Sequence, residues 1–387
     1  MEIAQTHKVI CKAVGDYDQS AVNAAVEAVF AACPGTAVLH AGSRVLLKPN
    51  LLAKHPPRHA VTTHPVVLRA AIAACVARGV LPQDITVADS PGGLYNAATL
   101  RGIYRAAGYT AVCEASGAQL YTACESAPRK ADGVLVREFN LIAPVHTADF
   151  IINLPKLKTH MMAGMTCAVK NLFGTIPGLQ KAELHTRFSE KERFGDMLVD
   201  LYACVAPNLH LVDGITAMEG DGPAGGAPRN VGVIFGGEDA FTVDLLAAQN
   251  IGISPAQVPY LKAAQGRGLC AQHFDAALLL GDTAAAAPVA GYRLPSGTAK
   301  LNFTSRVPGI LSGAAERVMQ SVAPRPSIAR AKCIGCGKCA EICPAHTIAI
   351  TAQKARIDPK HCIRCFCCHE VCPVKAIDVK RFGAFNL

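Results

Sequence analysis

Residues 333–344 read CIGCGKCAEICP, and residues 362–373 repeat the same cysteine spacing as CIRCFCCHEVCP. In each copy three cysteines are separated by two residues, and a fourth cysteine precedes a proline. Bacterial two-cluster ferredoxins use this spacing, and the fourth thiolate of each run ligates the cluster of the other run. The duplication therefore predicts two 4Fe-4S clusters, one held by Cys333, Cys336, Cys339 and Cys372 and the other by Cys362, Cys365, Cys368 and Cys343.

Structural zinc is the alternative metal that paired cysteines separated by two residues could bind. A zinc site needs neither the third cysteine nor the Cys-Pro step, and both features occur twice here. Cys367 lies between the ligands of the second motif, and we interpret it as a packed thiol. The first ten residues lack an export signal, so the many cysteines indicate a reducing compartment. We expect a cytoplasmic protein, and the oxygen sensitivity of such clusters favours an anaerobic cell.

The bulk composition limits the partners. The chain has 387 residues, 51% of them hydrophobic and 17% charged, which predicts a folded protein of two or three domains. The apolar stretch 275–292 contains Asp282 and Pro288, so we expect no membrane partner. Most of the net charge of +9 lies from Arg325 onward, where aromatic side chains that stack on bases are scarce. This argues against nucleic acid and favours an acidic electron-donor protein of the ferredoxin or flavodoxin type.

Apolar segments of strand length alternate with amphipathic helical segments before the cysteine-rich tail. Examples are the predicted strands 44–50 and 148–155 and the predicted helices 18–33 and 64–79. This alternation predicts an α/β domain with a mostly parallel layered sheet. The stretch SVAPRPS is rich in proline and indicates a linker. We therefore expect three parts, which are the α/β domain over 1–320, the linker over 321–328 and a small α+β ferredoxin-like domain over 329–387.

Short polar motifs follow the predicted strands of the large domain. They are LLKPN (46–50), VADSPGG (87–93), PKLKTH (155–160), VKNLFG (169–174) and DGITAMEGDGPAGG (213–226). In this order they resemble the domain of unknown function 362 family of iron–sulfur proteins. The resemblance covers nearly the whole chain, including the cysteine-rich tail. It implies 4Fe-4S clusters, but it does not imply one agreed reaction.

These motifs give a candidate site for a small anionic substrate, because parallel sheets bind ligands outside the carboxyl ends of their strands. Lysines rarely lie beside apolar strand ends without a partner. We expect Lys158, His160 and Lys170 to be catalytic, with His160 or a lysine donating a proton. The expected substrate-binding residues hold the anion, orient it or balance the lysines, and they are Lys48, Asn50, Asp89, Ser90, Lys156, Asn171, Asp213 and Asp221.

Other interpretations of these residues stay open. The lysines could form a solvated basic face, and the DSPGG loop could be an ordinary turn before a helix. Asp89, Asp213 and Asp221 could hold a divalent metal ion instead. His185 is a further candidate, although a surface position is the plainer interpretation.

The sequence as a whole favours a ferredoxin-linked reductase. In this hypothesis an external donor passes low-potential electrons through the two clusters to a small anionic organic substrate in the α/β domain. Two alternatives remain. The protein could be an electron-transfer or partner-binding subunit without turnover, or a non-redox isomerase or hydrolase whose clusters are structural.

Overall fold

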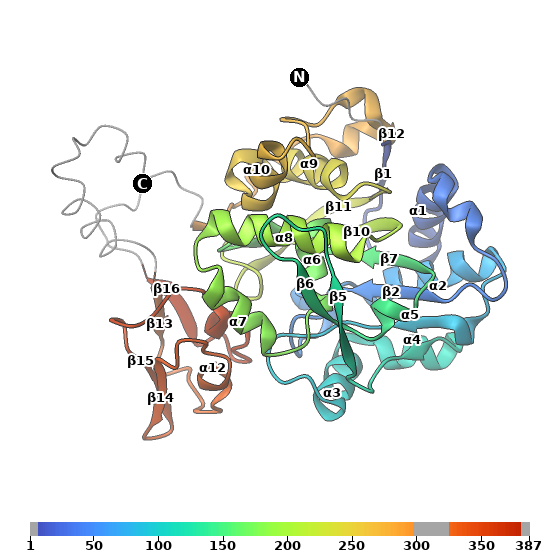
Figure 1. The fold of residues 1–387 in the computed structure, drawn as a ribbon. Helices are drawn as coiled ribbons and strands as arrows, with labels where there is room; N and C mark the ends of the chain where they lie inside the picture. Colours follow the sequence, from blue (N-terminus) through green and yellow to red (C-terminus); the bar gives the residue numbers. More distant parts are fainter. Residues whose placement is uncertain (1–6, 297–324, 381–387) are drawn as a thin grey trace.

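The computed structural model describes residues 7–296 and 325–380, which form two domains (Figure 1). The first range is an α/β domain, and the second is a small domain that lies beside helix α7 (Gln180–Arg187). The linker assigned to 321–328 is wrong in part, because 325–328 form strand β13 of the small domain. Proline suggested a linker there, but edge strands tolerate proline. Residues 321–324 lie outside the described residues.

The α/β domain is built on a ten-stranded sheet, in which eight strands follow the order β12-β1-β11-β10-β7-β2-β3-β4. The strands from β10 to β4 run parallel, and β11 is antiparallel to both of its neighbours. This confirms the predicted α/β class with a mostly parallel sheet. The bounds are β1 (Val9–Ala13), β2 (Val45–Pro49), β3 (Ile85–Val87), β4 (Gln119–Leu120), β7 (Phe150–Leu154), β8 (Lys156–His160), β9 (Gly164–Thr166), β10 (Leu209–Glu219), β11 (Ala227–Gly237) and β12 (Leu279–Gly281).

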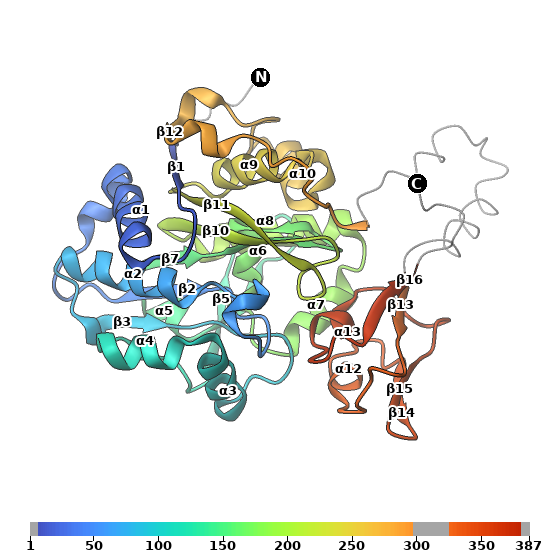
Figure 2. The same cartoon turned by 180° about the vertical axis from the view of Figure 1, so that it is seen from behind.

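Helices cover both faces of this sheet, as Figure 2 shows from behind. Successive strand residues point to opposite faces. Val45 and Leu47 pack into the core under α1, α2 and α4, whereas Leu46 packs into the core under α6, α8, α9 and α10. The helices are α1 (Gln19–Ala32), α2 (Pro65–Ala77), α3 (Ala97–Ala107), α4 (Tyr109–Ser116), α5 (Pro144–Thr147), α6 (Ala168–Asn171), α8 (Lys191–Val205), α9 (Ala240–Ile251) and α10 (Pro259–Gly266).

Strand β8 differs from the sequence-based expectation. The strand predicted over 148–155 ends at Leu154. After Pro155 a second strand, β8, begins and pairs with β10 in parallel. Lys156, Lys158 and His160 are therefore residues of a strand and do not follow one. All three side chains are buried. Charged and polar residues do not give the apolar pattern of a buried strand, so the sequence did not predict β8. They can be buried because partners from other elements offset the cost of burying them.

The small domain has two short sheets and two short helices. Strand β13 (Arg325–Ile328) pairs with β16 (Ile377–Lys380), and β14 (Ile348–Thr351) pairs with β15 (Lys354–Ile357). Helices α12 (Lys338–Glu341) and α13 (Cys367–Glu370) each carry the third cysteine of a motif. In the α/β domain, β5 (Ser126–Lys130) and β6 (Glu138–Ile142) form a separate hairpin. Within 7–296 and 325–380, no helix has the length and apolar character that crossing a membrane requires.

Candidate functional site

A cavity of about 60 Å³ lies between the two domains, beside the loops that follow β2 and β3. Lys158, Lys170 and Lys181 line it from the α/β domain, and Cys367 and Glu370 line it from α13 of the small domain. One water needs about 10–15 Å³ of such space, so the cavity has room for several water-sized groups. A small organic molecule is built of groups of that size.

Apolar and polar contacts hold the small domain against this cavity. Ala182 of α7 packs with Ile342, Cys367 and Val371 of the small domain. His369 reaches the Asp221 loop, where its Nε2 lies 3.3 Å from the Asp221 carbonyl oxygen. The wall of the cavity is therefore formed jointly by both domains.

Lys170 has the fewest hydrogen-bond partners of the cavity lysines among the described residues. Only 8% of the residue is exposed. Its Nζ lies 4.5 Å from the centroid of the Phe173 ring and 5.6 Å from that of Phe194. No described residue accepts a hydrogen bond from it. Burial lowers the pKa of Lys170 to about 8, and the Glu370 carboxylate opposes this shift. An anion in the cavity would give this ammonium a direct partner.

Lys158 lies on β8 and lines the same cavity as Glu370. It donates one hydrogen bond, to the Val61 carbonyl oxygen at 2.7 Å. Burial lowers the pKa of Lys158 to about 7, again opposed by Glu370. A lysine with this pKa holds and releases a proton near neutral pH, which is the range a general acid needs.

His160 faces the small domain from the end of β8. Its Nδ1 accepts hydrogen bonds from the backbone N–H groups of Met162 and Ala163, both at 3.2 Å. The proton therefore lies on Nε2, which is 3.4 Å from Glu370 Oε1. Burial holds the pKa of His160 well below its usual range, so the ring is neutral. A neutral ring is better suited to orienting a neighbouring group than to donating a proton. Of the two expected proton donors, His160 and a lysine, the lysine is therefore favoured.

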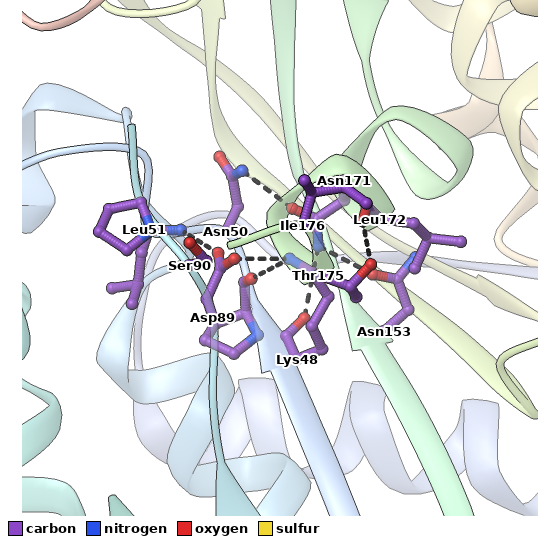
Figure 3. A network of polar contacts seen from close by, with 12 residues as sticks. Lys48, Asn50, Leu51, Asp89, Ser90, Asn153, Asn171, Leu172, Thr175 and Ile176 are labelled. Carbon is purple, nitrogen blue, oxygen red and sulfur yellow. Dashed lines mark hydrogen bonds and ion pairs between the residues drawn. The ribbon is translucent and has the colours of Figure 1, made fainter. Parts of the chain in front are cut away.

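Beneath the cavity lies a network of buried polar side chains (Figure 3). Lys48 Nζ is 3.2 Å from Asp89 Oδ1, and Asp89 Oδ2 accepts the Leu51 N–H at 2.8 Å. Asn171 accepts from Asn50 Nδ2 at 2.9 Å. Lys48 is already paired with Asp89 and does not line the cavity, so its expected contact with an anion stays a prediction. Asn50, Asp89 and Asn171 do line the cavity.

Lys156, Asp213 and Asp221 do not line the cavity. Lys156 Nζ is 2.8 Å from Asp213 Oδ2 and also donates to the Tyr17 hydroxyl. Asp221 accepts hydrogen bonds from Ser296. Each is engaged by a partner outside this cavity, and their expected role in substrate binding stays a prediction. Among described residues 7–296, no group of three or more His, Cys, Asp or Glu side chains is arranged to hold a metal ion.

Lys181 is a cavity residue that the sequence analysis missed. Its Nζ lies within hydrogen-bonding distance of four oxygen atoms, which are Ser90 Oγ at 2.8 Å and the carbonyl oxygens of Ser90, Pro91 and Ile176. Ser90 is thus tied to α7, and burial lowers the pKa of Lys181 to about 7. His185 is buried in the cavity wall, stacked on Phe194 with ring centroids 4.7 Å apart. Lysine on a helix looks like a surface residue, so no sequence signal marked Lys181.

Glu370 and Cys367 also escaped the sequence analysis as cavity residues. Glu370 follows the third cysteine of the second motif and resembles an ordinary surface carboxylate in sequence. Burial raises its pKa, and Lys170 and Lys158 oppose the shift. Only the docking of the small domain brings Glu370 to these lysines, and no local pattern encodes that docking.

The cysteine side chains fit the predicted ligand sets. A second, smaller cavity is lined by Cys333, Cys336, Cys339 and Cys372, so Cys372 joins the first motif in space. Backbone N–H groups face the sulfurs, including that of Ala376 at 3.2 Å from Cys372 Sγ. Such donors stabilise thiolates around a cluster. In the other set, burial raises the pKa of Cys362, and its neighbours Cys365 and Cys343 add to the shift.

An α/β domain carrying a cysteine-rich ferredoxin-like domain defines an iron–sulfur protein. The model described as 4Fe-4S dicluster domain matches residues 325–373, which confirms the predicted 4Fe-4S domain. The model described as Domain of unknown function (DUF362) matches residues 45–249. The chain therefore belongs to the DUF362 family, as its motifs indicated.

Two known proteins resemble the chain. It is 35% identical over 229 residues to the thylakoid-associated protein sll1697 of Synechocystis sp., a match that covers 59% of this chain and 69% of that protein. A solved structure, the lactate racemase apoprotein from Thermoanaerobacterium thermosaccharolyticum, gives a TM-score of 0.36 at 14% identity. That match covers 67% of this chain and 57% of the racemase, and a TM-score this low carries no functional conclusion.

Gly174 allows the buried ion pair beneath the cavity to form. A Cβ at this position would overlap Asp89 Oδ1 and would lie 2.7 Å from Lys48 Nζ. We expect Gly174→Ala to lower the free energy of unfolding by about 3 kcal/mol or more, because separating a buried pair leaves its charges uncompensated. Gly102→Ala on α3 is the control, since nothing lies within 4 Å of its Cβ. Urea unfolding of both variants is the measurement, and equal stabilities would contradict this role of Gly174.

Proposed function

We propose that the protein is a reductase for a small organic anion, supplied with electrons through the cysteine-rich domain. The observation that carries this proposal is the jointly formed cavity. Lys158 and Lys170 face it from one side, and Cys367 and Glu370, which lie among the cluster cysteines in sequence, face it from the other. A cationic cavity in contact with an electron-carrying domain supports reduction of an anion. It supports a partner-binding subunit without turnover, or a non-redox isomerase or hydrolase, less directly.

The chain's own residues can bind the anion and supply protons. Lys170 holds a carboxylate or phosphate group, since no described residue accepts a hydrogen bond from its ammonium. Asn50 and Asn171 orient the molecule from the cavity floor. When bound, the clusters supply single electrons at low potential. Saturating a C=C or C=O bond takes two electrons and two protons. Lys158 and Lys170 each donate one proton and recover it from solvent.

Anaerobic reoxidation tests the proposal. Protein reduced with dithionite and freed of excess reductant is mixed with unsaturated and 2-oxo carboxylates of two to four carbons. We expect one class to restore the oxidised visible spectrum and to yield a product two hydrogens heavier, detected by mass spectrometry. If none is reduced and none binds in calorimetry, the reductase proposal is wrong. Binding without reduction would favour non-redox chemistry.

Anion affinity is expected to fall as the pH rises from 7 to 9. Lys158 and Lys170 have pKa values of about 7 and about 8, so both ammonium groups lose their charge in this range. Affinity should fall about tenfold per pH unit for each proton that must be taken up with the anion. Calorimetric titrations in buffers of different ionisation enthalpy give both the affinity and the proton uptake. An affinity that is independent of pH would contradict the assignment.

Folding stability should change in the opposite direction in the absence of the anion. The pKa of these lysines is lower in the folded chain than the ordinary value of 10.5. Between pH 7 and this value the unfolded chain therefore binds more protons. The contribution of these lysines to the free energy of unfolding must rise with pH across that window.

A further inference from the structure

A basic groove of about 600 Å³ lies on the small domain, away from the substrate cavity. Five cationic side chains line it, and no aspartate or glutamate is among its lining residues. Four of them are exposed, and Lys354 is half-buried. The cationic residues of this basic groove are Arg325, Arg330, Lys354, Arg356 and Lys380.

The charges of the basic groove are arranged at a cost to folding. Arg325 lies directly opposite Lys380 in the antiparallel pair of β13 and β16. Like charges directly opposite each other destabilise such a pair. An acidic partner that binds there would offset this repulsion, whereas a surface without a partner would gain nothing from it.

The basic groove adjoins the first thiol set. Lys354 Nζ donates to the Cys333 carbonyl oxygen at 2.5 Å, and the Ala355 N–H faces Cys333 Sγ at 3.4 Å. Ile328 and Ala355 line both the groove and the cavity that contains Cys333. Cys367, which lies within the second motif, lines the substrate cavity instead. The small domain thus has one thiol set near the groove and the other near the substrate cavity.

We propose that the basic groove docks a small acidic electron-carrier protein, a proposal that rests on the reductase function and specifies its partner. Charge complementarity favours an acidic occupant and speeds its encounter. The groove lining has no aromatic side chain on which bases could stack, which disfavours single-stranded nucleic acid. The carrier would deliver electrons at the Cys333 side, farther from the substrate than the Cys367 side.

Charge reversal tests this docking with an acidic clostridial-type ferredoxin as the probe. We expect the double variant Arg325→Glu, Arg356→Glu to weaken binding about tenfold or more at low salt. Arg69→Glu on α2, an exposed residue of the other domain, is the matched control and should change affinity less than twofold. Affinity is measured by calorimetry at about 20 and 200 mM salt, and the difference between variants should shrink at the higher salt because of screening.

The outcomes separate this inference from the reductase proposal. Equal ferredoxin binding by the double variant and the wild type overturns the docking site. Binding of anionic phospholipid vesicles that is lost in the double variant, without ferredoxin binding, also overturns it in favour of a membrane surface. The double variant reduced by dithionite should still reduce the substrate at the wild-type rate. If ferredoxin binds as expected and no substrate is reduced by any variant, only the reductase proposal fails. The milder pair Arg325→Gln, Arg356→Gln guards against misfolding and should give a smaller loss of the same sign.

Discussion

Replacing Lys170 with methionine is expected to lower kcat/KM for the anionic substrate by about 100-fold or more. Truncating one partner of a buried charge contact costs about 2–5 kcal/mol, and no described residue accepts a hydrogen bond from Lys170. The same change is expected to raise the free energy of unfolding, because a buried ammonium without an anion is costly and methionine fills a similar volume. A gain in stability with a loss of activity is the signature of a functional residue.

An exposed lysine provides the comparison. Lys262 has 57% of its side chain exposed and lies 3.7 Å from Glu192, so Lys262→Met should change neither quantity appreciably. Thermal unfolding and steady-state rates of both variants, with visible spectra to verify the clusters, are the measurements. If Lys170→Met unfolds more easily and reacts as fast as the wild type, Lys170 is a structural residue and the anion site lies elsewhere.

Replacing Cys372 with alanine is expected to remove the cluster of the first motif, although Cys372 belongs to the second. Iron should fall from about eight to about four per chain. Cys333→Ala should do the same, and the double variant Cys333→Ala, Cys372→Ala should lose no more than either single variant. This follows because both residues line one cavity with Cys336 and Cys339. If each motif held its own cluster, the double variant would lose all of its iron.

Two further cysteine variants complete this test. Cys343→Ala should remove the other cluster, so that its combination with Cys372→Ala leaves the chain without iron. Cys367→Ala is the control and should keep both clusters. Iron and acid-labile sulfide analysis of anaerobic protein gives the counts. Electron paramagnetic resonance of the reduced protein shows whether two clusters still interact. Zinc in place of iron in the wild type would contradict the whole scheme.

The sheet and the cysteine motifs could be predicted because their signals are local. Strand 45–49 and helix 65–77 follow from the period of apolar residues and from Pro65 at the first helical turn, with His64 as the cap. The sharing of cysteines between the two motifs follows from their spacing. Three cysteines of one loop leave the fourth coordination position of a cluster open, and the other repeat must supply it. Strand β8 was missed because its buried residues are charged or polar.

The content of the cavity could be predicted only in part. Lys158 and Lys170 were expected there, and the structure places both in its wall. Lys48 and Lys156 seemed equivalent to them in sequence, but each is paired with an aspartate that lies far away in the chain. Glu370 reaches the lysines only because the small domain docks beside α7. Pairing and docking depend on the whole fold, so short motifs do not reveal them.

Because both domains form the wall of the cavity, neither domain can be exchanged without regard to the other. A tail grafted from another ferredoxin would restore iron binding, yet it would leave the lysines facing foreign residues unless it also presented Glu370, Cys367 and the apolar seal of Ile342 and Val371. Producing the halves as separate polypeptides should likewise give an incomplete pocket until they reassociate. Natural variants that change one half at this seam are therefore expected to carry a matching change in the other.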